Sequence, residues 1–158
     1  MPQIVSIVYT PNSITEPRPA EHYARVPLAA AELIEGRGIA GDRKGSRDRQ
    51  LNLMAAETLV ALKIEGFKTA PGELGEQIVL GGIDVNRLPV GTQLRLGETV
   101  IVEVVLPRTG CARFEAIQGH AKEKVTGRLG VIAQVVRGGT IRVGDPVQSL
   151  RGETDSRV

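Results

Sequence analysis

Short runs of aliphatic and β-branched residues, separated by glycines, dominate the chain and predict a mainly β protein. In the clearest runs, apolar and polar positions alternate with a period of two, as in Gln93, Leu94, Arg95 and Leu96. That period is typical of a strand with one face in a core. We expect strands at residues 3–9, 31–35, 50–53, 77–80, 93–96, 99–106, 131–137, 140–143 and 147–150.

Two glycine-containing turns predict β-hairpins. Gly97 and Glu98 lie between the expected strands 93–96 and 99–106, where a glycine can adopt a positive φ without steric cost. Gly138 and Gly139 are placed in the same way before residues 140–143. A sheet of many short strands must close on itself or cover its edges, so we expect a small, closed or partly open β-barrel.

Helical signals are fewer. Residues 55–65 carry Glu57 near the start, Lys63 near the end and a stop at Gly66, which predicts one helix. Residues 111–118, followed by Gly119, predict a second short helix or turn, and residues 121–125 another turn.

Length and composition indicate one domain, residues 1–150, with a polar tail at 151–158. The single Cys111 excludes an intrachain disulfide, and Cys111, His22 and His120 are too few for a conventional zinc site. A net charge of +2 and four aromatic residues do not favour nucleic-acid binding. Neither a signal peptide nor a bilayer-spanning apolar run is evident, so we expect a cytoplasmic protein without a membrane partner.

Residues 36–41 (GRGIAG) match the dinucleotide-binding pattern G-x-G-x-x-G, but no helical period follows them. We interpret the match as a loop. The next residues are rich in arginine and lysine, which would suit a phosphate, although charge alone favours an ordinary solvated loop. The basic residues are Arg37, Arg43, Lys44, Arg47 and Arg49, against Asp42 and Asp48.

Cys111 carries the most chemical information. It follows a predicted strand and Gly110, precedes a predicted helix, and is flanked by Arg108 and Arg113. Helix dipole and positive charge both favour a thiolate, which can bind a soft metal or accept a sulfur atom. A lone cysteine is also often an inert core residue, and the sequence leaves the two readings open.

Two acidic and two histidine residues are weaker candidates. Asp42 and Glu76 each follow a glycine, where a carboxylate can act as a general acid or base or can bind loop amides. We take the structural role as the default. His22 and His120 are expected to face solvent, and nothing indicates a Ser-His-Asp arrangement.

Five segments, taken together and in order, resemble the MOSC domain, named for the C-terminal domain of molybdenum cofactor sulfurases. The resemblance covers residues 4–150 and implies a stand-alone, bacterial-type member with a pyruvate-kinase-type β-barrel and a few short helices. Gln77 stands where the family commonly has asparagine. The segments are GIAGDR (38–43), PGELGEQIVL (71–80), LPVGTQLRLG (88–97), PRTGCARFEAI (107–117) and GRLGVIAQVVRGGTIRVGDPV (127–147).

The resemblance implies that the chain binds the molybdenum cofactor, a molybdenum held by the dithiolene of a phosphorylated pterin (molybdopterin). Cys111 would be the catalytic residue and the metal ligand, or would receive a sulfane sulfur. The basic loop would suit the pterin phosphate. The expected cofactor-binding residues are Arg108, Arg113, Asp42, Arg43, Lys44, Gly75 and Glu76.

Three functions remain open at this point. The first is an oxidoreductase acting on N-hydroxylated or related small substrates, supplied with electrons by a separate electron-transfer protein because no flavin or iron–sulfur signature is present. The second is a sulfur or cofactor carrier, in which Cys111 holds a persulfide delivered by a separate, pyridoxal-phosphate-dependent cysteine desulfurase. The third is a barrel that binds another anion or a protein, with Cys111 buried and silent.

Overall fold

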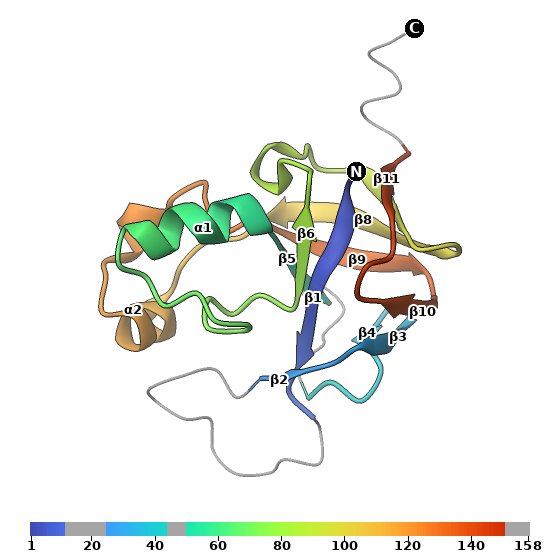
Figure 1. Ribbon diagram of the computed structural model, residues 1–158, viewed down its shortest axis with the longest axis horizontal. Helices are drawn as coiled ribbons and strands as arrows, with labels where there is room; N and C mark the ends of the chain where they lie inside the picture. The colour runs from blue at the N-terminus through green and yellow to red at the C-terminus, as the bar shows by residue number, and fades with distance from the viewer. Residues whose placement is uncertain (12–24, 44–49, 151–158) are drawn as a thin grey trace, which may run out of the picture.

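The strands form where the sequence alternates. The computed structural model describes residues 1–11, 25–43 and 50–150 (Figure 1). Strands β1 (Gln3–Tyr9), β7 (Gln93–Leu96) and β9 (Val131–Arg137) have the predicted bounds. The other expected strands differ by one or two residues at an end: β3 (Ala30–Ile34), β5 (Leu51–Ala55), β6 (Ile78–Gly81), β8 (Val100–Pro107), β10 (Gly139–Arg142) and β11 (Val147–Ser149).

Two further strands, β2 (Val26–Pro27) and β4 (Gly38–Ile39), were not predicted. Each has two residues, too few to show an alternating pattern. β4 also shows that the G-x-G-x-x-G match at residues 36–41 is not a dinucleotide-binding turn. These residues lead from β3 into β4, which pairs with β3, and no helix follows them in the described chain before β5. The loop interpretation of this match is therefore confirmed.

Within the described residues, the strands form a curled eight-stranded sheet in the order β11-β7-β8-β9-β5-β6-β1-β2, and a smaller sheet in the order β10-β3-β4 (Figure 1). Backbone bonds join β1 to the segment entering β11: the Ile4 N–H donates to the Asp145 carbonyl (2.9 Å) and the Val147 N–H to the Pro2 carbonyl (3.0 Å). These bonds bring the two sides of the curled sheet together at one end. The expected mainly β, partly open barrel is confirmed.

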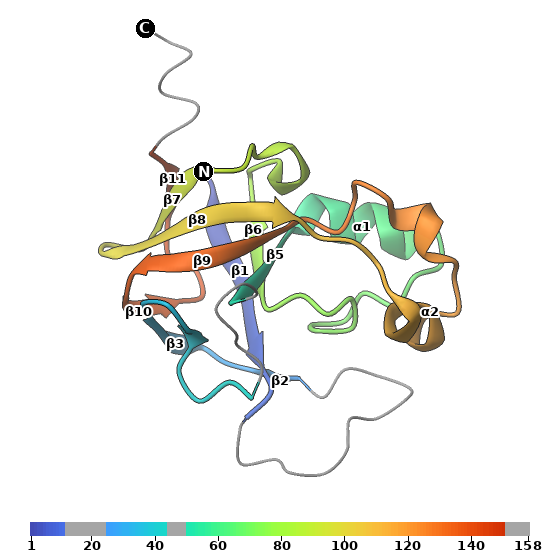
Figure 2. The same cartoon turned by 180° about the vertical axis from the view of Figure 1, so that it is seen from behind.

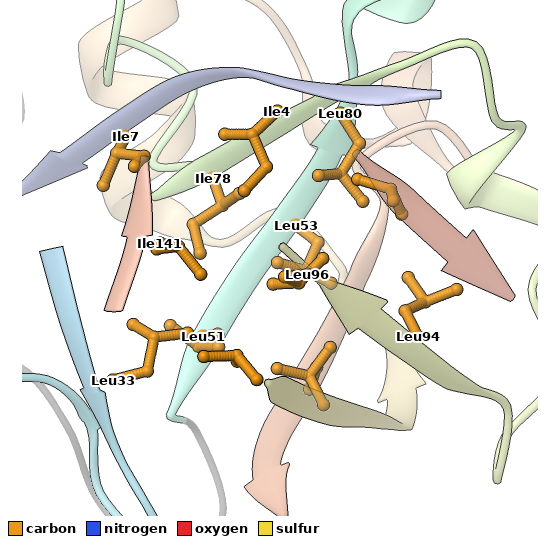
Figure 3. Packing of buried hydrophobic residues seen from close by; sticks show 14 of the residues in the cluster. Ile4, Ile7, Leu33, Leu51, Leu53, Ile78, Leu80, Leu94, Leu96 and Ile141 are labelled. Atoms are coloured by element: carbon orange, nitrogen blue, oxygen red, sulfur yellow. The ribbon is translucent and has the colours of Figure 1, made fainter. Parts of the chain in front are cut away.

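The main core lies inside the curl, and Figure 3 shows side chains from many strands meeting there. Alternation places them: Leu94 and Leu96 of β7 and Val100, Val102 and Val104 of β8 are all buried. The predicted hairpin between these two strands is confirmed, with Leu96 opposite Val100 and Gly97 at φ +69°.

The second predicted hairpin is wrong. β9 pairs with β8 and β5, whereas β10 pairs with β3, so Gly138 and Gly139 carry the chain from one sheet to the other. A Cβ on Gly138 would lie 2.5 Å from the Leu33 carbonyl oxygen, and one on Gly139 2.6 Å from Thr99 Oγ1. The two glycines therefore permit a close passage between strands, not a tight two-residue turn.

Helices α1, α2 and η2 lie together on one side of the barrel (Figures 1 and 2). The predicted helices are α1 (Ala56–Ile64) and α2 (Ala112–Gln118), and the last predicted turn is the 3-10 helix η2 (Lys122–Val125); a further 3-10 helix, η1, spans Val85–Arg87. In the described chain, no helix has the length and apolar character needed to cross a membrane. Helices α1, α2 and η2 cover a second core on the outer face of the sheet, made of Met54, Leu62, Phe67, Leu74, Phe114, Val125 and Leu129.

Candidate functional site

The loop formed by residues 71–77 lies against both the barrel and α2, and Glu76 holds it in shape. The Glu76 side chain is 0% exposed. Its carboxylate accepts hydrogen bonds from the Gly72 N–H (2.8 Å) and the Leu74 N–H (3.1 Å). Glu76 therefore binds loop amides, which is the structural role taken as the default from the sequence.

Glu76 also has a cationic neighbour. Burial raises the pKa of the Glu76 carboxyl, while the loop N–H groups and the positive charge of Arg108 lower it in part. Arg108 follows the end of β8 and is itself only 8% exposed, with its backbone N–H donating to the Gly130 carbonyl (3.0 Å). Arg108, from the motif that contains Cys111, and Glu76, from the 71–77 loop, therefore bring these two segments of the chain together.

Asp42 lies on the barrel side of the same loop. It accepts hydrogen bonds from the Thr10 N–H (3.2 Å) and from Gln77 Nε2. Gln77 Oε1 in turn accepts the Asn52 N–H (3.0 Å), so the glutamine joins the loop of Asp42 to β5. This gives a structural use to the residue by which the chain departs from the MOSC pattern.

Gly75 is fixed through its carbonyl oxygen. Asn52 Nδ2 and Arg25 Nη2 both donate to it, each at 2.9 Å. The stem of Arg25 also packs closely on Gly72, where an added Cβ would lie 2.7 Å from Arg25 Cβ. Sequence reasoning missed Arg25 and Asn52, because neither belongs to a motif and both contact the loop from distant parts of the chain.

Cys111 is the residue before α2 and has an exposed free thiol. Its backbone is extended, with φ −143° and ψ 178°, and its carbonyl accepts the Glu115 N–H at 3.0 Å. The sharp turn predicted at Gly110 is wrong, because residues 108–111 form neither a turn nor a bend. An added Cβ on Gly110 would lie 2.8 Å from Lys122 Cβ. Because Cys111 is exposed, a position for it in the core is wrong.

Two of the remaining basic candidates belong to the described residues and differ in exposure. Arg113 is half-buried in the first turn of α2, and Arg43 is exposed, with its backbone N–H donating to the Thr10 carbonyl at 2.6 Å. Lys44, Arg47, Asp48 and Arg49 lie outside the described residues, as do His22 and the predicted tail at 151–158.

Gln118, at the end of α2, ties this helix to the segment that leads into the 71–77 loop. Its Oε1 accepts the Lys68 N–H (2.8 Å), and its Nε2 donates to the carbonyls of Lys68 and Glu73 (both 2.9 Å). The nearby His120 is half-buried and stacks on Phe67 with ring centroids 4.2 Å apart, so its expected solvent-facing position is only partly right.

Comparisons with known proteins agree with this arrangement. The family model described as "MOSC domain" matches residues 40–148, well over half of the chain. The chain belongs to the MOSC domain family. This family is associated with the molybdenum cofactor.

Solved structures of similar fold include two YiiM proteins and YuaD. YiiM of Geobacillus stearothermophilus is 20% identical with a TM-score of 0.73, over 96% of this chain and 76% of that one. YiiM of Escherichia coli is 19% identical (TM-score 0.70; 94% and 70%), and YuaD of Bacillus subtilis is 19% identical (TM-score 0.71; 96% and 98%). None of the curated proteins matches the chain. These likenesses establish the fold.

The MOSC motifs divide into two groups in this structure. Asp42, Gly75, Glu76 and Arg108 are brought together around the 71–77 loop by the contacts above. Cys111 lies at the other end of α2 from Gln118, the residue that contacts this segment. The motif residues thus form a largely buried frame, in which only Asp42 is half-buried, and the exposed Cys111 lies at the start of the adjoining helix.

The described residues hold no cluster of side chains that could bind a metal ion without further ligands. Among residues 1–11, 25–43 and 50–150, no group of three His, Cys, Asp or Glu side chains could hold a metal ion. The described residues line cavities of about 500, 410 and 370 Å³, and Cys111 lines none of these three. A metal at Cys111 would therefore need most of its ligands from elsewhere, which fits a molybdenum that arrives on a dithiolene and takes one soft protein ligand.

Proposed function

We propose that this MOSC protein binds the molybdenum cofactor with Cys111 as the protein ligand of the metal, and acts as an oxidoreductase on N-hydroxylated or related small substrates. The observation that carries the proposal is the exposure of Cys111, the chain's single cysteine, at the residue before α2. A soft thiolate suits a sulfur-rich molybdenum centre. When bound, the cofactor would supply the two-electron redox chemistry.

The chain's own residues would do the binding and positioning. Cys111 would hold the metal, and the exposed Arg43 and half-buried Arg113 would bind the pterin phosphate through charge-assisted hydrogen bonds. Asp42 and Glu76 would act indirectly, because their carboxylates already accept hydrogen bonds from the protein. Their part in this proposal is to hold the loops that frame the site.

The first experiment measures molybdenum and pterin per chain in protein purified from a host that makes the cofactor. We expect nearly stoichiometric loading for the wild type and loss of molybdenum in Cys111→Ala and Cys111→Ser, with unchanged melting temperatures because the side chain is exposed. Wild-type protein that folds without molybdenum, or a Cys111→Ala variant that keeps it, would contradict the proposal.

A second experiment tests the phosphate contact. Arg43→Ala should lower pterin content, whereas Arg137→Ala, at another exposed arginine at the end of β9, should not. Equal effects of the two substitutions would mean that only general charge matters. The oxidoreductase activity itself is tested by reduction of an N-hydroxylated base with an added electron-transfer protein, which should require both cofactor and Cys111.

The second candidate function is a sulfur carrier, and the same exposed thiol favours it. In this reaction the Cys111 thiolate attacks the outer sulfur of a desulfurase persulfide, forming a new S–S bond while the donor cysteine leaves as a thiolate. Incubation with cysteine and a pyridoxal-phosphate-dependent desulfurase should then add the mass of one sulfur atom at Cys111, and none in Cys111→Ala. Unmodified wild-type protein after this incubation, combined with stoichiometric molybdenum, would leave metal binding as the function.

A further inference from the structure

Helix α1 is apolar on both sides, although only one side faces the protein. Its inner side supplies Leu62, which is fully buried, and Leu59, which packs against the second core. On its outer side, Val60 is 63% exposed and Ile64 is 83% exposed. A surface helix normally carries polar residues on its outer side, so this pair, one helical turn apart, indicates a covered surface.

Charged residues flank the two apolar side chains. Glu57 lies one turn before Val60, and its Oε2 is held by the Gly82 N–H at 2.9 Å. Lys63 lies one turn after Val60 and is exposed. Glu57 and Lys63 are six residues apart and so do not pair within the helix. We call the exposed Glu57, Val60, Lys63 and Ile64, together with the half-buried Ala56, the Val60 face.

We propose that the Val60 face binds a second copy of this chain, with the two α1 helices antiparallel about a two-fold axis at Val60. In that arrangement, residues equally distant from Val60 on either side lie opposite each other. Glu57 therefore meets the partner's Lys63, and Lys63 meets the partner's Glu57. The bulky Ile64 meets the partner's small Ala56, and the two Val60 side chains meet at the axis.

Charge complementarity selects a second copy as the occupant. A two-fold interface must be complementary to itself, and this face carries one negative and one positive residue at equal distances from its centre. A parallel pairing would place like charges together. The contact spans two helical turns, so the interface is small and the dimer is weak and concentration-dependent.

Analytical ultracentrifugation of the full chain over a wide concentration range tests the proposal. The average mass of the wild type should rise towards twice the 16.9 kDa of the monomer. Val60→Glu should remain monomeric throughout. The matched control is Val90→Glu, at a 64% exposed valine in the loop between η1 and β7, which should dimerise like the wild type. A monomeric wild type, which would leave a different protein as the occupant, overturns the proposal, as does a Val60→Glu variant that still dimerises.

A charge exchange tests the antiparallel pairing itself. Lys63→Glu places two glutamates opposite each other and should abolish dimerisation, and adding Glu57→Lys in the same chain should restore it. Glu57→Lys also removes the bond to Gly82, so the melting temperature of each variant is measured alongside. A Lys63→Glu variant that dimerises normally, or a folded double variant that stays monomeric, overturns the pairing.

Discussion

Replacing Glu76 tests whether its carboxylate holds the 71–77 loop. Glu76→Ala leaves the Gly72 and Leu74 N–H groups without their acceptor, and both residues are buried. Each buried N–H left unsatisfied costs about 1–3 kcal/mol, so the free energy of unfolding should fall by about 2–6 kcal/mol. Glu76→Gln keeps the size and one acceptor oxygen, and should cost less.

Urea unfolding measures these changes, and Glu73 provides the control. Glu73 belongs to the same loop, but its carboxylate accepts the Ala70 N–H at an exposed position (3.0 Å). Glu73→Ala should therefore cost no more than about 1 kcal/mol. The reasoning fails if Glu76→Ala is no more destabilising than Glu73→Ala.

The pH dependence gives a second readout of the same carboxylate. Burial raises the folded-state pKa of Glu76 above the 4.5 of the exposed group, so the native state takes up a proton before the unfolded state does. The resulting stabilisation is complete below pH 4.5 and is lost as the pH rises through the folded-state pKa. Each unit of difference in pKa corresponds to about 1.4 kcal/mol.

Relative to Glu76→Gln, which does not titrate, the wild type should therefore become more stable as the pH falls from 8 towards about 5. The comparison uses the difference between the two unfolding free energies at each pH, so titration elsewhere in the protein cancels. If the wild type instead loses stability relative to Glu76→Gln on acidification, the hydrogen bonds from the loop amides and the charge of Arg108 outweigh burial in setting the pKa of Glu76.

Two further predictions concern backbone geometry and the polar frame. In Gly130→Ala (φ +73°) the added Cβ would lie 1.9 Å from the Leu53 carbonyl oxygen, whereas the Cβ added in Gly91→Ala (φ +93°) would meet only open space. In denaturant unfolding, Gly91→Ala should lower the free energy of unfolding by about 1–3 kcal/mol, because of backbone strain alone, and Gly130→Ala should lower it clearly more. Equal losses would show that strain in φ alone matters. Gln77→Asn restores the residue common in the family. The asparagine side chain is one methylene shorter, so it cannot donate to Asp42 and accept the Asn52 N–H of β5 at the same time. The free energy of unfolding should therefore fall by about 1–2 kcal/mol in the same assay. A neutral substitution would show that the bridge is dispensable.

Local patterns were enough to predict most of the fold. Each long strand reads as an alternation within its own segment, and the helix ends are marked by Gly66 and Gly119, both at positive φ. The wrongly predicted hairpin shows that a local pattern does not identify a distant strand partner. Gly138 and Gly139 look like a turn in sequence, but β10 pairs with β3, more than 100 residues earlier. Only the three-dimensional arrangement reveals that partner.

The candidate site shows the same limit. The position of Cys111 at the start of a helix follows from its neighbours in sequence, and its exposure excludes the core position that the sequence left open. Arg25 and Gln118 carried no such signal. Each contacts the 68–75 segment across 50 residues of sequence, so neither could be assigned to the site before the fold was known.

The division into a buried frame and exposed groups makes the proposed function separable from stability. Glu76 and Gln77 are buried and bonded within the protein, so substituting them should lower the unfolding free energy and reduce cofactor loading only as the frame loosens. Cys111 and Arg43 are exposed, so substituting them should reduce loading at unchanged stability. Plotting molybdenum content against unfolding free energy for the four variants should therefore give two separate groups. A single line through all of them would mean that loading follows stability alone, and that Cys111 has no direct part in holding the metal.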